Sequence, residues 1–296
     1  MKLSMHNWMR PEPLEVTVAR LARFGYDAIE ISGEPAVYDP KETRRILEKH
    51  KIRCSGSVSI MTHDRDLTHC DKYIRFGTIE YLSDCIRMVH ELGASMMCIV
   101  PAEVGRTAPH GEARDQWKWA VESLKRVMDV ARKEKVTVGL EPINRFETNF
   151  LNRCDQALAL AKDVGDDVGV VLDAFHINIE EDDPVAAIRL AGKKLVDFHV
   201  ADTNRRPPGQ GHLDWRGVIG ALKEIGYKGT LTAEFVNPVD RTASARKPTA
   251  WSGTLTAEGA SAAQLKFIQD HGSGVLSEAE YDKAVEETST FLKKLL

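Results

Sequence analysis

The sequence predicts a single α/β domain, a (β/α)8 TIM barrel with a long insertion between strand 8 and the C-terminal helix. Eight short apolar runs alternate with amphipathic segments, which is typical of parallel strands joined by crossover helices. The later runs are nearly unbroken stretches of valine, leucine and isoleucine, as strands buried on both faces require. A chain of 296 residues, 43% of them hydrophobic, is long enough for one such barrel over residues 1–296.

The eight predicted strands extend from the start of the chain to residue 236. In order they are Lys2–Trp8, Asp27–Ser32, Arg53–Ser59, Ser95–Val100, Val136–Pro142, Val168–Ala174, Leu195–Asp202 and Gly229–Val236. Eight repeats suggest closure into a barrel, with one helix expected after each strand.

The segments between the strands carry helix start and stop signals. An N-cap residue followed by proline marks two helix starts, at Asp39-Pro40 and Asp183-Pro184. A glycine stands where the residue after a helix end is expected at three places, Gly25, Gly165 and Gly226. These signals support the alternation of strands and helices independently of the apolar runs.

One long segment interrupts the alternation. About 40 residues, Asn237–Leu276, follow the eighth strand, far more than a usual loop. Asn237–Ser252 has the composition of an irregular loop, whereas Thr256–His271 has the pattern of one amphipathic helix. Ser277–Glu280 then has the spacing of a capping box, which predicts a final helix toward Leu296. A lid, a subunit-contact segment and a neutral insertion all fit residues 237–276.

Composition argues against several partners and compartments. The formal net charge of -4 gives no overall field that attracts nucleic acid. No apolar run approaches the roughly 20 residues of a membrane span, and the first residues lack the apolar stretch of a signal peptide. We therefore expect a soluble, cytoplasmic protein without a nucleic-acid or membrane partner. The cysteines form no CxxC pair and are expected to be reduced, packed thiols: Cys54, Cys70, Cys85, Cys98 and Cys154.

Four consecutive strands end in side chains that commonly bind metal ions. Glu141 closes the fifth strand and Asp173 the sixth, while His199 and Glu234 lie late in the seventh and eighth. In a barrel of this kind the active site lies at the C-terminal ends of the strands, so these four side chains should meet. Three buried carboxylates beside a histidine need a compensating cation or shared protons.

A single divalent metal ion is the simplest compensation. Three carboxylates and one imidazole suit Mn²⁺, Mg²⁺ or Co²⁺, with Mn²⁺ the expected cofactor, although the ligand types also allow Zn²⁺. Taken alone, His199 fits a hydrogen-bonded core histidine and Glu234 the partner of an arginine. Their recurrence at four successive strand ends favours the metal site.

The motifs around these residues resemble those of a known enzyme family. EPINRFE, LDAFH, HVADTNRRPPGQGHLDW and AEF are similar to the motifs of the ketose 3-epimerases acting on tagatose and allulose, which belong to the xylose-isomerase-like barrels. The resemblance covers Lys2 to Val236 and fades in the insertion. It implies that Glu141, Asp173, His199 and Glu234 bind the metal. It also implies that the two glutamates flank C3 of the sugar as acid and base.

The same resemblance implies three substrate-binding residues, Glu147, His176 and Arg205, which would hydrogen-bond oxygens at the C1 to C3 end of the sugar. The residues alone leave other interpretations open. His176 fits a loop histidine, Arg205 could form a solvated basic pair with Arg206, and Glu147 could pair with Arg145. Three tryptophans could line the sugar pocket or serve only in packing: Trp8, Trp117 and Trp119.

The chemistry of inversion gives these roles a reason independent of the family. A proton beside a carbonyl is hard to remove in water. A metal that bridges the carbonyl and the adjacent hydroxyl oxygens stabilises the resulting enediolate. Two carboxylates on opposite faces then permit inversion, because one removes the proton and the other returns one from the far side.

Four other functions compete with this one. An aldose–ketose isomerase would need a second metal. The barrel endonucleases for abasic DNA need histidines where this chain has Ser32, Ser59 and Arg205. An enzyme acting on oxidised glycosides or inososes, such as a C-glycoside-cleaving catalytic subunit, keeps the proton chemistry and accommodates the insertion. A sugar-binding protein has no need for two carboxylates flanking one metal. We expect a sugar substrate and a homo-oligomer, with a hetero-oligomer left open.

Overall fold

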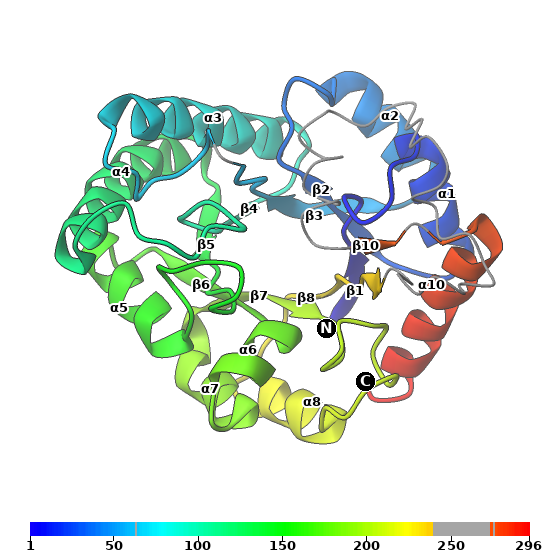
Figure 1. The fold of residues 1–296 in the computed structure, drawn as a ribbon. Coiled ribbons are helices and arrows are strands. Elements are labelled where there is room, and N and C mark those ends of the chain that lie inside the picture. Colours follow the sequence, from blue (N-terminus) through cyan, green and yellow to red (C-terminus); the bar gives the residue numbers. More distant parts are fainter. Residues whose placement is uncertain (63, 239–272, 275) are drawn as a thin grey trace, which may run out of the picture.

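The fold is a closed barrel of parallel strands surrounded by helices (Figure 1). The computed structural model describes residues 1–62, 64–238, 273–274 and 276–296. Its central eight-stranded sheet has the order β1-β8-β7-β6-β5-β4-β3-β2. An isolated parallel bridge between His6 and Glu30 joins the first strand to the second and closes the sheet on itself. The predicted (β/α)8 barrel is confirmed.

Each of the eight predicted strands is present and lies within its expected range. They are β1 (Lys2–Met5), β2 (Ala28–Ser32), β3 (Arg53–Val58), β4 (Met96–Ile99), β5 (Thr137–Leu140), β6 (Gly169–Asp173), β7 (Leu195–Val200) and β8 (Thr230–Ala233). Every neighbouring pair from β1–β8 round to β2–β3 is parallel. All the C-terminal strand ends therefore open at the same end of the barrel.

The helices form the outer ring. They are α1 (Leu14–Arg23), α2 (Pro40–His50), α3 (Lys72–Glu91), α4 (Ala113–Glu134), α5 (Cys154–Val164), α6 (Ala174–Glu180), α7 (Pro184–Ala191), α8 (Trp215–Glu224) and α10 (Glu278–Lys293), with a short 3-10 turn, η1 (Gly192–Lys194). One helix per crossover is wrong between β6 and β7, where α6 and α7 both lie. Asp173 causes the difference, because it ends β6 and also caps α6 by accepting the amide of Phe175.

The predicted helix start and end signals are confirmed. Asp39 and Asp183 cap α2 and α7 through their side chains, each ahead of a proline. Gly25 and Gly226 adopt φ of 72° and 73°, the left-handed conformation that favours glycine after a helix. Gly165 likewise directly follows the end of α5, but in extended conformation, with φ 170°.

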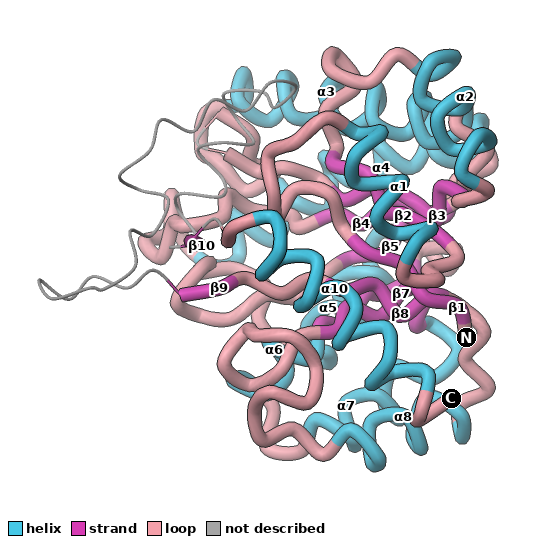
Figure 2. Tube along the Cα trace, turned by 90° about the vertical axis from the view of Figure 1, so that its right-hand side faces the viewer, coloured by secondary structure: helices cyan, strands magenta, loops and turns pink. Residues whose placement is uncertain are grey.

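The two ends of the long insertion lie side by side. Strand β9 (Asn237–Pro238) pairs antiparallel with β10 (Ser273–Gly274), at the end of the barrel where the strands finish (Figure 2). The helix expected over Thr256–His271 lies outside the described residues. The capping box at Ser277 is confirmed and starts α10. Among the described helices, none is both long and apolar enough to cross a membrane.

The barrel interior is not uniformly apolar. Ionisable side chains inside it are fully buried, among them His6, Glu30, Asp173, Asp197 and His199. The expectation of packed thiols is wrong for Cys70, which is exposed, whereas Cys85, Cys98 and Cys154 are buried and Cys54 is half-buried. Asp173 and His199 lie at the C-terminal ends of β6 and β7, which is where the sequence places the active site.

Candidate active site

The four predicted strand-end residues meet inside the mouth of the barrel. Asp173 and His199 are register partners on β6 and β7, and Glu141 and Glu234 directly follow β5 and β8. None of the four is more than 6% exposed. Parallel strands of similar length bring their C-terminal ends to one level, so adjacent strands place these side chains together.

His199 lies between the two glutamates. Its Nδ1 is 3.1 Å from Glu141 Oε1 and 3.4 Å from Glu234 Oε2. Asp173 completes the group from the next strand, since one donor atom each of Glu141, Asp173 and His176 lie within 4.8 Å of one another. One donor atom each of His6, His199 and Glu234 also lie within that distance. These contacts place oxygen and nitrogen donors around one small volume.

Neutral donors hold one oxygen of each glutamate. The Cys98 thiol donates to Glu141 Oε2 at 3.2 Å, and the Trp8 indole N–H donates to Glu234 Oε1 at 3.0 Å. The other oxygen of each carboxylate faces His199. Trp8 therefore belongs to this site, as the sequence allowed.

Trp117 and Trp119 lie elsewhere. The Trp117 indole donates to Asp163 on α5, and the Trp119 ring lies against the guanidinium of Arg75. Both rings start from helix α4, on the outer ring of the barrel. They are helix-packing residues, so the possibility that they line a sugar pocket is not supported.

Among the predicted ligands, two buried carboxylate oxygens lack a hydrogen-bond donor within the residues that the structure describes. Asp173 Oδ1 accepts the amide of Phe175, but Asp173 Oδ2 and Glu234 Oε2 have no hydrogen-bond partner in the described part of the chain. Leaving such atoms buried and unsatisfied is costly. A divalent cation would satisfy both oxygens and offset the excess negative charge, so the residues present fit a hard or borderline metal ion.

The pKa shifts within the cluster also indicate an excess of buried negative charge that a cation would offset. Burial raises the pKa of Asp173 well above its usual range, and the charge of Glu234 adds to the shift. Burial alone would lower the pKa of His199, but Glu141 and Glu234 raise it well above its usual value. Burial would raise the pKa of Glu234, whereas His6 and His199 hold it well below its usual range. Without a cation, the cluster limits its negative charge by keeping protons on Asp173 and His199.

Glu147, His176 and Arg205 come together beside this cluster through Asn144. Glu147 Oε1 accepts from Arg205 Nη1 and from Asn144 Nδ2, both at 2.8 Å. His176 Nδ1 accepts the backbone amide of Asn144 at 3.2 Å, so the proton of the neutral ring lies on Nε2, which faces Asp173. Burial lowers the pKa of His176 and keeps the ring neutral. The three predicted residues thus form one hydrogen-bonded group at the edge of the site.

The alternative interpretations of Arg205 and Glu147 do not match the geometry. Arg145 pairs with Glu180 at 2.8 Å. Arg205 is buried, whereas Arg206 is exposed. Arg205 adopts φ 59°, and its guanidinium lies 4.8 Å from the Phe175 ring centroid. A non-glycine residue in the left-handed region marks a backbone that the surrounding contacts hold in place.

Sequence analysis missed several residues around the site: His6, Glu30, Cys98, Asn144 and Asp197. Two of them carried a signal. Glu30 stands two residues before Ser32, and Asp197 two before His199, so the period of a strand points these charged side chains into the barrel as well. Cys98 and Asn144 carried no comparable signal, because their roles depend on contacts with residues 43 and 32 positions away.

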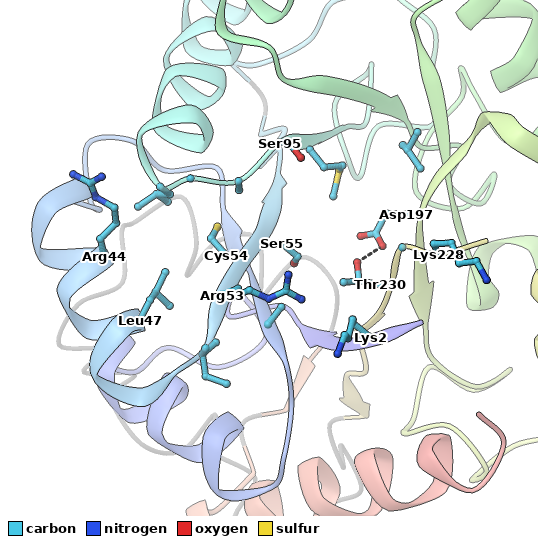
Figure 3. A pocket seen from close by; sticks show the side chains of 18 of the residues that line it. Lys2, Arg44, Leu47, Arg53, Cys54, Ser55, Ser95, Asp197, Lys228 and Thr230 are labelled. Atoms are coloured by element: carbon cyan, nitrogen blue, oxygen red, sulfur yellow. Dashed lines mark hydrogen bonds between the residues drawn. The ribbon is translucent and has the colours of Figure 1, made fainter. Parts of the chain in front are cut away.

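A cavity of about 690 Å³ opens at the opposite end of the barrel (Figure 3). Lys2, Arg53 and Lys228 lie along its wall, and Asp197 lies at its inner side, where it accepts a hydrogen bond from Thr230 at 2.6 Å. None of the residues predicted to bind metal or substrate lines this cavity. In barrels of this type the N-terminal end serves stability rather than chemistry.

Comparison with known proteins identifies the family of this barrel. Residues 18–269 match the family described as Xylose isomerase-like TIM barrel. The chain belongs to this family. An L-ribulose 3-epimerase from Mesorhizobium japonicum is 31% identical over 223 residues, 75% of each chain. A D-psicose 3-epimerase from Ruminiclostridium cellulolyticum is 30% identical over 228 residues, 73% of this chain and 76% of the relative.

Solved structures share the fold. The crystal structure of D-allulose 3-epimerase from Methylomonas sp., in complex with D-allulose, has a TM-score of 0.84 at 24% identity and covers 100% of this chain and 97% of that one. This likeness concerns the fold alone. The relatives at 30% identity and above are named as sugar epimerases, and this member of the family is likewise an enzyme that acts on carbohydrates.

Proposed function

We propose that the chain is a divalent-metal-dependent ketose 3-epimerase. The observation that carries the proposal is the pair Glu141 and Glu234, which approach His199 Nδ1 at 3.1 and 3.4 Å. Each glutamate has one oxygen held by a neutral donor and the other directed to a shared volume. Inversion at a carbon beside a carbonyl can proceed by proton removal on one face and proton return on the other, and two carboxylates can supply both steps. The L-ribulose and D-psicose 3-epimerases among the relatives support the assignment to C3 of a ketose.

Glu141, Asp173, His199 and Glu234 would hold the cation. Mn²⁺ is the expected ion, and Mg²⁺ and Co²⁺ suit the same donors. When bound, the cation supplies a Lewis acid that stabilises negative charge on adjacent substrate oxygens. The unsatisfied oxygens of Asp173 and Glu234 support this use of the site.

Glu141 and Glu234 would move the proton. One carboxylate takes the C3 proton on one face of the sugar, which leaves an enediolate, and the other glutamate gives a proton to C3 on the opposite face. The roles exchange when the reaction runs from the other epimer. Cys98 and Trp8 each hold one oxygen, which orients the second oxygen of each glutamate for the transfer.

Glu147, His176 and Arg205 would bind and orient the sugar. The Nε2–H of His176 and the guanidinium of Arg205 can donate to the oxygens at the C1 to C3 end, while Glu147 can accept from a hydroxyl. The buried positive charge of Arg205 would also favour the oxyanion that develops during proton removal. Asn144 ties this group together, because it contacts both Glu147 and His176.

Residues 237–276 would cover the mouth of the barrel or contact another subunit. Strand β9 begins directly beyond the segment that carries Glu234, and it pairs with β10 from the far end of the insertion. The insertion therefore leaves and returns at the same end as the active site. A homo-oligomer is the assembly we propose, with a hetero-oligomer as the alternative.

A substrate panel tests the proposed function. The Mn²⁺-reconstituted enzyme is incubated with free ketoses, their phosphates and oxidised glycosides, and the products are separated by chromatography and assigned by NMR. We expect free ketoses to give their C3 epimers, and the D173A variant to give none. Turnover of oxidised glycosides alone would indicate that the same proton chemistry acts on another substrate class. Aldose products would indicate an isomerase, and no turnover of any panel member would contradict the proposal.

A further inference from the structure

Glu30 is a charged side chain in the middle of β2 that the proposed mechanism does not use. It is fully buried, and neither of its carboxylate oxygens has a hydrogen-bond partner within the described residues. A buried carboxylate without donors is among the costlier features a barrel interior can contain. Because Glu30 in this position does not stabilise the fold, we expect it to have a functional role.

The nearest charged partner of Glu30 is the outer nitrogen of a proposed metal ligand. Glu30 Oε2 lies 3.6 Å from His199 Nε2, and that nitrogen also has no hydrogen-bond partner in the described structure. The other ring nitrogen, Nδ1, faces Glu141 and Glu234. The imidazole therefore lies between two groups of carboxylates and presents one nitrogen to each. Closing 3.6 Å to hydrogen-bond length needs a shift of well under an ångström.

Asp197 competes for the same nitrogen, at 3.7 Å. Its oxygens, however, already accept from three hydroxyl groups: Tyr227 at 3.1 Å, Thr230 at 2.6 Å and Thr232 at 3.1 Å. Figure 3 shows the Thr230 bond among the residues that line the cavity at the opposite end of the barrel. Asp197 is thus satisfied without the imidazole, whereas Glu30 is not.

We propose that Glu30 is a positioning residue for His199. It accepts the Nε2–H, which leaves Nδ1 without a proton and directs its lone pair to the volume between Glu141 and Glu234. Histidines that bind metals generally donate their second N–H to such a partner, and losing it costs about 10–100-fold in metal affinity. The inference rests on the proposed function, because it takes His199 to be a metal ligand.

A positioning role and a structural role predict opposite effects on stability. If Glu30 served only to stabilise the barrel, its removal would lower the melting temperature. A carboxylate without donors should instead be replaceable by an apolar side chain of similar size with equal or higher stability in the metal-free protein. Weaker metal binding together with an unchanged or raised melting temperature is therefore the signature of positioning.

Three variants of the full chain separate these cases. E30L removes both charge and acceptor, E30Q keeps an acceptor without the charge, and D197N is the matched control for the neighbouring carboxylate. The Mn²⁺ dissociation constant is measured from the electron paramagnetic resonance of free Mn²⁺, and the melting temperature is measured without metal. We expect about 10–100-fold weaker binding for E30L, a smaller loss for E30Q, and a dissociation constant close to wild type for D197N.

The outcomes distinguish failure of the positioning role from failure of the proposed function. E30L binding Mn²⁺ as tightly as the wild type would overturn the positioning role and leave the proposed function intact. A larger loss for D197N than for E30L would overturn it too, by assigning the contact to Asp197. A wild-type protein without bound Mn²⁺ would contradict the proposed function itself. Should E30L fail to fold, wild-type affinity in E30Q overturns the inference, and weaker binding supports it.

Discussion

At the scale of single residues, burial decides what each carboxylate can do. Glu141 and Glu234 are the same side chain at equivalent positions of β5 and β8, and each has one oxygen fixed by a neutral donor. Asp173 has one oxygen fixed by a backbone amide and one without a partner among the described residues. This difference suits the glutamates to the proposed proton transfer and Asp173 to the proposed cation.

Exchange of each glutamate for glutamine tests the two proton-transfer roles. E141Q and E234Q keep the size and one ligand oxygen, but the amide cannot accept the proton. Turnover at saturating Mn²⁺ should fall by about 10²–10⁴-fold in each variant. Metal content is measured on the same samples, and E122Q on the exposed side of α4 is the control. Full turnover in both variants with metal bound would exclude these carboxylates as acid and base.

Asp173→Asn should separate function from stability. The folded protein raises the pKa of Asp173, so folding binds this proton, and the free energy of unfolding falls as pH rises above the ordinary aspartate range. Asparagine removes that penalty and still caps α6. At pH 7 the metal-free variant should gain about 1–2 kcal/mol, roughly 2–8 °C in melting temperature. Calorimetry without and with Mn²⁺ measures both effects. A variant that is less stable than the wild type would contradict the predicted gain. A variant that Mn²⁺ stabilises as much as it does the wild type would contradict the proposed role of Asp173 as a ligand.

At the scale of elements, buried parallel strands were the most predictable part of the chain. Their unbroken apolar runs and the polar residue at each end located β5 to β8 and the four strand-end residues. The extra helix α6 was missed because Asp173 combines a strand end with a helix cap, without an intervening turn that the sequence would reveal. The contact between Asn144 and His176 was missed because it joins the loop after β5 to helix α6, and local patterns carry no information on such contacts.

The paired strands β9 and β10 make the insertion removable. Because its two ends are joined as neighbours, a short Asn-Gly turn can replace residues 239–272 without stretching the backbone of the barrel. We expect the shortened protein to keep its melting temperature and its Mn²⁺ affinity. We also expect it either to show a higher KM or to change its number of subunits, measured by light scattering. If KM and the number of subunits both equal those of the full chain, the insertion is neutral.

At the scale of the whole molecule, the proposed ligands come from four adjacent strands, so a bound cation would connect half of the barrel wall. The pKa values of Asp173 and His199 are raised in the metal-free protein, by burial for Asp173 and by Glu141 and Glu234 for His199, which favours the protonated form of both groups. A cation has to displace these protons. Metal binding is therefore linked to pH as well as to the stability of the fold.

This linkage has a measurable sign. Mn²⁺ binding should release protons, and the affinity should weaken steadily as pH falls through the raised pKa values. Titration calorimetry in two buffers of different ionisation enthalpy gives the number of protons released. The D173N variant, which lacks one of the two protons, should release fewer if it binds at all. Binding that is independent of both buffer and pH would mean that the ion occupies another site.

The central claim is that inversion proceeds by proton removal and return between Glu141 and Glu234. Its most direct measurement is a reaction in D2O, with the Mn²⁺ enzyme and a ketose that it converts, followed by NMR at C3. The account predicts that product formed early in the reaction carries deuterium at C3, because the returning proton comes from a carboxyl group that exchanges with solvent. Product that keeps its original C3 hydrogen at every stage would contradict the account and indicate transfer without exchange.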